Sequence, residues 1–269
     1  MGRSLKYEIP GDDPRVSPDE IGRFGWPALF ARARARAAAR AAACAEVIEA
    51  SPADPGAGDP EAKERRRVLE IGFGRGEFLL ALAANASETD YVGIEVSWKR
   101  GLKMARKVAR ARLPNVLLAV GRGEEGLRDW FAPRSLAEIW VNFSDPWPKA
   151  RHAERRLVGA GFVARAARAL APGGMLYVAT DDVPYAHQID EVLAAEKTLE
   201  NHYAPLAFLP EVPGRMTTGY EAQWRAESRP LHFFAYSLRG EDMLRGEETL
   251  RGEEALRNEA STRGAEGGR

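Results

Sequence analysis

The sequence RRVLEIGFGRGEFLLALA, residues 66–83, decides the fold of this chain. A continuous apolar run comes first, then a turn with Gly72, Gly74 and Gly76, then a helical pattern. A strand that is apolar throughout is typical of a sheet covered by helices on both faces. Glycines after such a strand let the backbone bend sharply and approach a ligand, and the helix N-terminus beyond them favours electron-rich groups. The stretch therefore predicts a strand–loop–helix unit with a ligand at the loop.

The same alternation continues outward from this stretch. Further apolar runs occupy residues 90–95, 116–121, 138–143 and 175–180, with helical patterns between them. This order predicts an α/β fold built on a doubly wound, mostly parallel sheet. The last run, residues 231–238, follows another strand-like stretch without a long helix in between. We therefore expect an antiparallel hairpin at the C-terminal edge of the sheet.

Composition divides the chain into three regions. Residues 1–65 form an N-terminal extension, in which an alanine- and arginine-rich helix precedes a proline- and glycine-rich linker. Residues 66–238 hold the organised domain. Residues 239–269 contain the repeat RGEDML, RGEETL, RGEEAL, whose period of six never aligns the leucines on one helical face. We interpret this tail as disordered, with a frayed helix as the alternative.

The global composition limits the partners and the compartment. Lysines and arginines number 39, and so do the acids, so only a local basic surface could attract a nucleic acid. The single cysteine, Cys44, excludes a disulfide framework and suits a reducing compartment. No apolar run resembles a signal peptide or reaches membrane-spanning length. We expect a cytoplasmic protein without a membrane partner.

Acids around the glycine turn indicate the kind of ligand. A dinucleotide fingerprint would need glycine at position 77, where Glu77 stands, and that carboxylate would repel a pyrophosphate. Glu95 ends the second strand, where an acid can bind both hydroxyls of a ribose. Glu70 precedes the turn and can face a cation. Each feature alone has a simpler interpretation, because the glycines could form only a tight turn and Glu95 could cap the next helix. Together they favour S-adenosylmethionine.

The segment SDPWPKARHAERR, residues 144–156, carries an acid, a ring and cations in succession. It follows the fourth strand, so Asp145 is expected at the carboxyl edge of the sheet, where ligands bind in such folds. Pro146 and Pro148 restrict the backbone there, and Trp147 either stacks on a base or fills the turn. The basic run that follows suits the phosphates of a polynucleotide, with a solvated helix start as the alternative; it comprises Lys149, Arg151, His152, Arg155 and Arg156.

A second basic surface is predicted on the helix after the second strand. Its cations recur at steps of three and four on one face, opposite an apolar face: Lys99, Lys103, Arg106, Lys107 and Arg110. No acid occurs in residues 96–113, so the face favours a polyanion, although ordinary solvated lysines are the alternative.

The motifs together resemble one family. LEIGFGRGEFL, VGIE, NFSDPWPKARHAERRL, ATDDVPYA and TGYE occur in the order found in bacterial tRNA (guanine-N7)-methyltransferases. The resemblance covers roughly residues 26–238, with an unusual insertion near 31–65. It implies a Rossmann-like, class I S-adenosylmethionine-dependent methyltransferase that methylates N7 of a guanosine in the variable loop of tRNA. It departs from the family at Arg122, Ser144 and Gly219, which replace an acid near the adenine, a proline and an RNA-contacting lysine.

The resemblance and the residue chemistry give the following assignments. Asp145 is the expected catalytic residue. The expected cofactor-binding residues are Glu70, Gly72, Gly74, Gly76, Glu95 and Arg122. The expected substrate-binding residues are Lys149, Arg151, His152, Arg155, Arg156, Asp181, Thr218, Gly219, Tyr220, Glu221, Lys103, Lys107 and Arg110. Asp181 could instead cap a helix, and Glu221 could be a surface acid. We expect no metal.

Several alternatives stay open at this point. The enzyme could act on another RNA purine or a small molecule, or the chain could be a catalytically weak RNA-binding relative. The arginines at positions 32, 34, 36 and 40 could compensate for the lysine that is replaced by Gly219, although a spacing of two scatters them around a helix. The expected partner is tRNA, with no obligatory protein partner evident, and the chain is expected to be a monomer or a homodimer.

Overall fold

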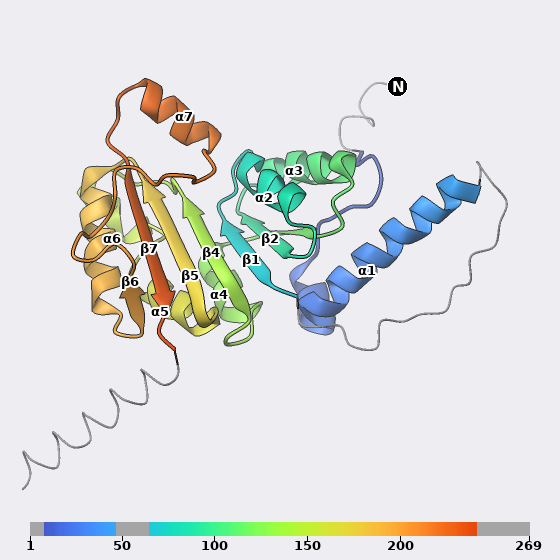
Figure 1. The fold of residues 1–269 in the computed structure, drawn as a ribbon, viewed down its shortest axis with the longest axis horizontal. Helices are drawn as coiled ribbons and strands as arrows, with labels where there is room; N and C mark the ends of the chain where they lie inside the picture. The colour runs from blue at the N-terminus through green and yellow to red at the C-terminus, as the bar shows by residue number, and fades with distance from the viewer. Residues whose placement is uncertain (1–7, 47–64, 241–269) are drawn as a thin grey trace, which may run out of the picture.

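A computed structural model describes residues 8–46 and 65–240 of the chain, and Figure 1 shows their arrangement. Most of the predicted linker and nearly all of the predicted C-terminal tail lie outside these residues. The described strands form one seven-stranded sheet in the order β3-β2-β1-β4-β5-β7-β6. They are β1 (Arg67–Ile71), β2 (Asp90–Glu95), β3 (Val116–Val120), β4 (Leu136–Asn142), β5 (Leu170–Thr180), β6 (Leu199–Asn201) and β7 (His232–Leu238).

The sheet reverses its strand order at β1. This strand pairs in parallel with β2 on one side and with β4 on the other, so that Ile71 lies beside both Ile94 and Val141. In an open α/β sheet the crevice beyond the carboxyl ends at such a reversal is the usual ligand site. The glycine turn after β1 and the Asp-Pro-Trp-Pro segment after β4 therefore leave the sheet side by side.

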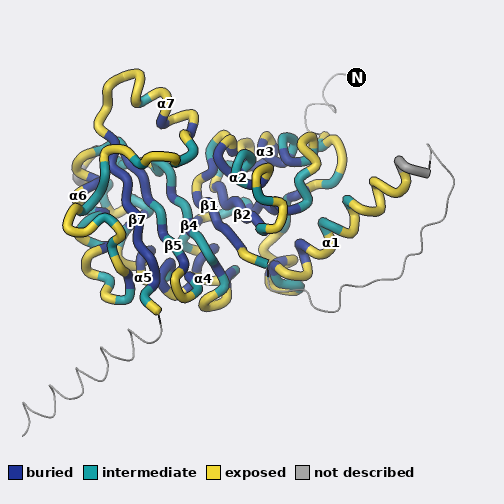
Figure 2. The backbone as a smooth tube through the Cα atoms, in the orientation of Figure 1, coloured by how far each residue is buried: buried dark blue, intermediate teal, exposed yellow. Residues whose placement is uncertain are grey.

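Helices pack on both faces of β1 and β2, which explains why these strands are buried throughout, whereas β4 is only partly buried. The remaining elements are α1 (Pro18–Glu46), α2 (Glu77–Asn85), α3 (Trp98–Ala111), α4 (Gly123–Asp129), η1 (Ala150–Arg155), α5 (Ala160–Ala169), α6 (Val183–Ala195) and α7 (Gly219–Ala226). Helices α2 and α3 pack on one face, against Val68, Tyr91 and Leu118. Helices α4, α5 and α6 pack on the other face in a larger cluster. In Figure 2 much of the strands carries the dark blue of buried residues.

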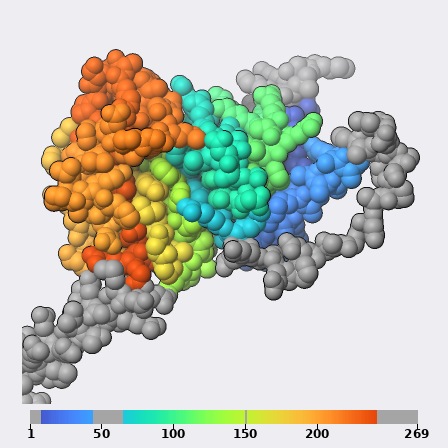
Figure 3. Space-filling view, in the orientation of Figure 1, coloured from blue at the N-terminus to red at the C-terminus, as the bar shows by residue number. Residues whose placement is uncertain are grey.

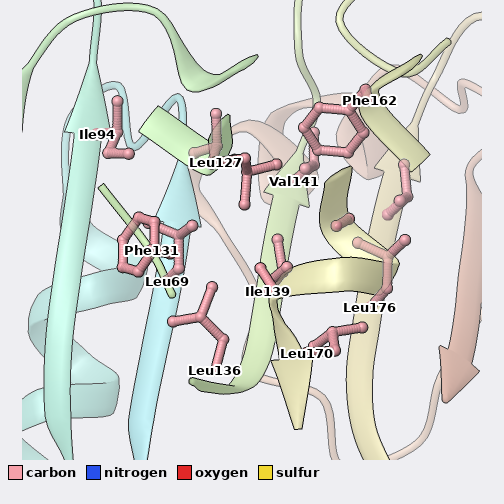
Figure 4. Packing of buried hydrophobic residues seen from close by; sticks show 14 of the residues in the cluster. Leu69, Ile94, Leu127, Phe131, Leu136, Ile139, Val141, Phe162, Leu170 and Leu176 are labelled. Carbon is pink, nitrogen blue, oxygen red and sulfur yellow. The ribbon is translucent and has the colours of Figure 1, made fainter. Parts of the chain in front are cut away.

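The larger cluster joins the strands to the helices of its face through aliphatic side chains. Leu69, Ile139 and Leu176 project from three adjacent strands towards Leu127 and Phe162, as Figure 4 shows. All five side chains are at most 2% exposed. Burial of such side chains contributes roughly 1.5–3 kcal/mol each, so this layer holds the carboxyl edge of the sheet in a fixed shape.

The C-terminal part of the sheet is antiparallel, as the sequence predicts. β7 pairs antiparallel with β5, and the short edge strand β6 pairs antiparallel with β7. The connection from β6 to β7 is long and contains α7, which lies beyond the carboxyl ends of the central strands (Figure 1). The predicted fold class is confirmed, and this connection supplies one wall of the candidate site.

The N-terminal helix α1 enters the same core as the sheet. A non-helical backbone at Gly25, two residues before Pro27, kinks the helix. Trp26 and Phe30 are buried in the larger cluster, and the Trp26 Nε1–H donates a hydrogen bond to the Trp130 carbonyl oxygen at 2.7 Å. The predicted domain boundary at residue 65 stays a prediction from composition. In the structure, however, residues that precede this boundary, such as Trp26 and Phe30, lie within the core.

Candidate active site

The glycine turn requires its glycines for conformational reasons. Gly72, Gly74 and Gly76 have φ values of 75°, 54° and 72°, a region that other residues rarely adopt. A Cβ at Gly76 would also lie 2.0 Å from the Met104 sulfur on α3. The turn therefore packs closely on α3 and presents backbone groups, rather than side chains, to the space above β1.

Glu95 anchors this turn from the end of β2. It is buried, and one carboxylate oxygen accepts a hydrogen bond from the Gly74 N–H while the other accepts one from the Ser97 N–H, each at 3.0 Å. The side chain that caps the next helix is that of Ser97, not Glu95, because the Ser97 hydroxyl accepts from the Arg100 N–H at 3.4 Å. Each carboxylate oxygen can accept a second hydrogen bond, so the two oxygens of Glu95 retain capacity for a ligand's hydroxyls.

Glu70 is a buried carboxylate that is only partly satisfied. Oε1 accepts a hydrogen bond from the Asn142 side-chain amide at 3.3 Å, whereas Oε2 is buried and forms no hydrogen bond with the described residues. Burial raises the pKa of Glu70 to about 7, against the opposing effects of Asn142, Arg215 and the nearby Leu79 amide. A buried acceptor without a donor is costly, and a cationic ligand would remove that cost.

A pocket lies between Glu70, the glycine turn and the start of α7. Its walls include Glu70 and Asn142 from the sheet, the turn from Gly72 to Gly76, and Thr218, Gly219 and Tyr220 from α7. Tyr220 also lies beneath the Arg75 guanidinium, whose carbon is 5.8 Å from the ring centroid. The structure thus brings predicted cofactor-binding and substrate-binding residues into a single pocket.

Helix α7 is held over this pocket by buried charges. Glu221 is 2% exposed and accepts hydrogen bonds from two guanidinium groups, those of Arg215 and of Arg225, the latter at 3.0 Å. Arg215 also donates to the Asn142 side-chain oxygen at 2.6 Å. The Thr218 hydroxyl caps α7 by accepting from the Glu221 N–H at 3.0 Å. A continuous chain of hydrogen bonds therefore runs from Glu70 through Asn142 and Arg215 to Glu221, which is not a surface acid.

The Asp-Pro-Trp-Pro turn carries Asp145 beyond the end of β4. Asp145 is exposed, and its Oδ1 accepts a hydrogen bond from the Trp147 N–H at 3.2 Å. Trp147 adopts a positive φ of 44°. The Arg156 Nε–H donates to the Pro146 carbonyl oxygen at 2.8 Å and a second guanidinium nitrogen donates to Gln188 at 2.7 Å. Arg156, which was predicted to bind substrate, therefore stabilises the turn.

The other members of the basic run lie on η1 and around the indole. The Arg155 guanidinium carbon lies 5.1 Å from the Trp147 ring centroid, and the His152 ring meets the same indole edge-on at 5.8 Å. Lys149 and Arg151 are exposed. Because these cations surround one exposed turn, they form a local positive surface beside Asp145 on a chain with no net charge.

Two other predicted residues have partners elsewhere. The Asp181 carboxylate accepts from Arg229 at 2.9 Å, and the cap of α6 is Asp182, which accepts from the Tyr185 N–H at 2.8 Å; the alternative that Asp181 caps this helix is wrong. Arg122 is the N-cap residue of α4 and lies 3.8 Å from Glu124. It does not belong to the residues that line the glycine pocket.

The basic face of α3 is present, and one of its members has a structural role. Lys103 and Arg110 are exposed. The Lys107 ammonium donates to the Arg75 carbonyl oxygen at 2.8 Å and lies 3.9 Å from Glu77. Lys107 therefore stabilises the glycine turn, whereas the side chains of Lys103 and Arg110 are exposed to solvent.

Two residues of the site were not predicted from the sequence. Asn142 is a polar residue at the end of an apolar run, and that interruption was the available signal. Arg215 lies in the irregular connection after β6, and no periodic pattern marks it. Within the described residues, no cluster of histidine, cysteine or acidic side chains could hold a metal ion, and no helix is long and apolar enough to span a membrane.

Comparisons with known proteins agree with this geometry. A family model described as a putative methyltransferase matches residues 64–234. The tRNA (guanine-N(7)-)-methyltransferase of Halorhodospira halophila is 38% identical over 174 residues, which cover 64% of this chain and 75% of the relative. The protein of the same description from Thiobacillus denitrificans is 42% identical over 160 residues, covering 60% and 70%. The crystal structure of the 16S rRNA methyltransferase KamB shares the fold at a TM-score of 0.50 and 17% identity, covering 66% of this chain and 90% of KamB.

Proposed function

Because the chain belongs to the bacterial tRNA (guanine-N7)-methyltransferase family, we propose that it methylates N7 of a guanosine in the variable loop of tRNA, with S-adenosylmethionine as the methyl donor. The observation that carries the proposal is the pocket at Glu70. There a buried carboxylate oxygen without a hydrogen-bond partner faces a glycine turn, below the capped start of α7.

The residues present fit this cofactor. Glu70 offers a negative charge to a cationic amino group, and the positive-φ glycines leave room for close approach of the ligand to the backbone. Glu95 lies one strand away with acceptor capacity for two ribose hydroxyls. When bound, S-adenosylmethionine supplies an electrophilic methyl group. Arg122 does not line the pocket, nor does Glu95, and the assignment of Arg122 to the cofactor stays a prediction from the sequence.

The protein residues have to align the guanine and stabilise its developing charge. N7 of guanine carries an exposed lone pair and no proton at neutral pH, so no general base is needed. Asp145, which extends beyond the end of β4, can accept hydrogen bonds from the N1–H and N2–H edge of the base and stabilise the positive charge that the ring acquires. The hydrogen bond from Arg156 to the Pro146 carbonyl holds that carboxylate in place. Alignment of this kind is the main contribution that the protein can make here.

The remaining predicted residues bind the polynucleotide in this proposal. Lys149, Arg151 and Arg155 lie beside Asp145 and suit the phosphates that flank the target nucleotide. Tyr220 and Gly219 cover the glycine pocket from α7. Glu221 pairs with two arginines and holds α7 in place, and its contact with the substrate stays a prediction. A cytoplasmic location and a monomeric or homodimeric state remain predictions.

Nucleoside mapping tests this proposal. Total tRNA from cells with and without the protein, and tRNA incubated with the purified protein and S-adenosylmethionine, would be digested and analysed by mass spectrometry. We expect 7-methylguanosine to appear only with the protein, and reduction and aniline cleavage to place it in the variable loop. Methylation of another purine or of no tRNA nucleoside would overturn the proposal.

A further inference from the structure

A groove separates the second half of α1 from the body of the protein. Its walls are α1, the segment from Asp12 to Val16 and the C-terminal end of α3. Leu29, Val108 and Leu113 are among the apolar residues on its floor. Figure 3 shows α1, in blue, beside the green surface that contains α3. We call this feature the α1–α3 groove; none of the proposed catalytic or cofactor-binding residues lines it.

Three arginines of α1 line the groove in a single row. Arg32, Arg36 and Arg40 are exposed and are spaced by four residues, which is a rise of about 6 Å per step along a helix. Arg34 points elsewhere and donates to the Asp90 carboxylate at 2.8 Å. The alternating pattern ARARAR is therefore divided in the structure: one arginine fixes the helix to β2, and the others form a regular row of charges.

The groove is basic in spite of its acids. Its lining contains five arginines and three acidic residues, and each acid has a basic or capping partner. Asp13 pairs with Arg15 at 2.7 Å, Asp12 with Arg40 at 3.1 Å, and Glu20 accepts from the Ser17 N–H at 2.9 Å. The two ion pairs are solvent-exposed, and such pairs contribute only about 0–1 kcal/mol, so a phosphate can replace the acid at small cost.

Helix α3 connects this groove with the candidate active site. It begins after Ser97, beside the glycine turn, and ends at Ala111, just before Arg112, which lines the groove. Its 14 residues span about 21 Å. Lys99, Lys103 and Arg110 are exposed along the helix between these two ends. The cations of α3 therefore connect the carboxyl edge of the sheet with the row of arginines on α1. A single nucleotide is too short to contact both ends of this path.

We propose that the α1–α3 groove binds the sugar-phosphate backbone of the substrate RNA at a region remote from the methylated base. This inference rests on the proposed function for the identity of the RNA as tRNA. The regular row of arginines and its continuity with α3 favour a polynucleotide, because phosphates recur at a regular spacing along its strand. Backbone contacts of this kind position an RNA without reading its sequence.

The test replaces Arg32, Arg36 and Arg40 together by glutamine, which removes the charges and keeps a similar helix propensity. Binding of tRNA would be titrated at several salt concentrations. We expect weaker binding, with a salt slope reduced by roughly 0.7–0.9 log units for each phosphate that the variant no longer neutralises. A stem-loop that contains only the variable-loop region, trimmed to less than the roughly 21 Å that α3 spans, should not reach α1, so both proteins should bind and methylate it equally well.

Two further variants serve as controls. Replacing Arg128, Arg165 and Lys197 by glutamine removes the same charge from α4, α5 and the turn after α6, and should leave tRNA binding unchanged. Replacing the three arginines of α1 by lysine keeps the charge and should retain most of the affinity. An unchanged salt slope in the glutamine variant of α1 would overturn the proposal. A wild-type protein that binds tRNA through α1 but forms no 7-methylguanosine would overturn the proposed function and leave this inference standing.

Discussion

At the scale of single residues, Glu70 links the cofactor pocket to the stability of the protein. Its pKa is raised from 4.5 to about 7 in the folded chain, chiefly by burial. Between these values the folded protein holds a proton that the unfolded chain has released. The contribution of Glu70 to the free energy of unfolding therefore decreases as the pH rises from about 4.5 to about 7 and is constant above.

Replacement of Glu70 by glutamine should remove this pH-dependent decrease. The variant stays neutral, so its free energy of unfolding should exceed that of the wild type by roughly 3 kcal/mol at pH 8 and by little at pH 4.5, since each pKa unit corresponds to about 1.4 kcal/mol. Urea unfolding without cofactor at both pH values measures the difference. The glutamine variant should also bind S-adenosylmethionine more weakly at pH 8. Glu88, which is exposed, gives the control variant Glu88→Gln, and equal stability of Glu70→Gln and wild type at both pH values would contradict the interpretation.

Asp145 should separate catalysis from RNA binding. Asp145→Asn keeps an oxygen that can accept from the Trp147 N–H, so the turn should persist. We expect turnover to fall by about 10²–10³, the range found when a group that stabilises transition-state charge is removed. Affinity for tRNA should remain near that of the wild type, because phosphate contacts supply most of it. Single-turnover kinetics and a binding titration measure both quantities. The control is Glu154→Gln, an exposed acid in the same segment; a matched loss of affinity and turnover in Asp145→Asn would argue against the assigned role.

Among the predictions for single residues, the sharp turn at the glycines after β1 follows from a local rule. Positive φ at Gly72, Gly74 and Gly76 follows from the turn that ends a buried strand. The partners of Glu70 could not be predicted in the same way. Asn142 reaches it from a strand that is adjacent in space and distant in sequence, and Arg215 comes from an irregular connection. Long-range pairing of polar groups leaves no periodic signal in a single sequence.

At the scale of elements, α7 depends on the buried pair of Arg215 and Glu221. The Arg215 side chain is 8% exposed, whereas that of Arg225, the second partner, is 36% exposed. Arg215→Met should lower the free energy of unfolding by roughly 3–5 kcal/mol, because Glu221 loses a buried partner. It should also weaken cofactor binding, since Asn142 loses its donor. Arg225→Met, the matched control, should cost about 1 kcal/mol or less.

A double variant checks the origin of that destabilisation. In Arg215→Met combined with Glu221→Met, both members of the buried pair are removed, so Glu221 is not left as a buried charge without Arg215. Much of the stability should therefore return, as measured by urea unfolding. A double variant no more stable than Arg215→Met alone would show that packing of the guanidinium, for example against Phe233 at 4.8 Å, dominates.

The basic face of α3 should act on RNA affinity alone. Replacing Lys99, Lys103 and Arg110 by glutamine leaves Lys107 bound to the glycine turn. Binding of tRNA should weaken, and its salt slope should fall by roughly 0.7–0.9 log units for each phosphate that is no longer neutralised, while calorimetry shows normal cofactor affinity. Lys107→Gln should do the opposite and weaken cofactor binding. If the triple variant keeps the wild-type salt slope, this face is only a solvated surface and does not bind RNA.

At the scale of the whole molecule, the sequence predicts the sheet better than it predicts the role of α1 and of the segment before it. The order of strands and helices from β1 to α6 follows from continuous apolar runs and helical patterns, whereas η1 and α7 were not predicted. Composition assigns everything before residue 66 to an extension. In the structure, Ile21, Trp26 and Phe30 belong to the larger hydrophobic cluster, and the segment before α1 pairs with β3 at Leu118. A tryptophan that packs on residues some hundred positions away gives no local sign of its partner.

The last prediction concerns this attachment of α1. Trp26 stacks on Phe131 with ring centroids 5.4 Å apart, and its indole N–H donates to Trp130. Trp26→Ala should lower the free energy of unfolding by about 3–5 kcal/mol, the usual cost of removing a buried aromatic ring. Trp26→Phe keeps a ring and loses the hydrogen bond, so it should cost about 1 kcal/mol more than the exposed control Ala39→Ser. If α1 shares the core, both variants unfold in one cooperative transition that fluorescence and circular dichroism report together. A separate early transition in Trp26→Ala, with the sheet unaffected, would instead show that α1 is an independent extension.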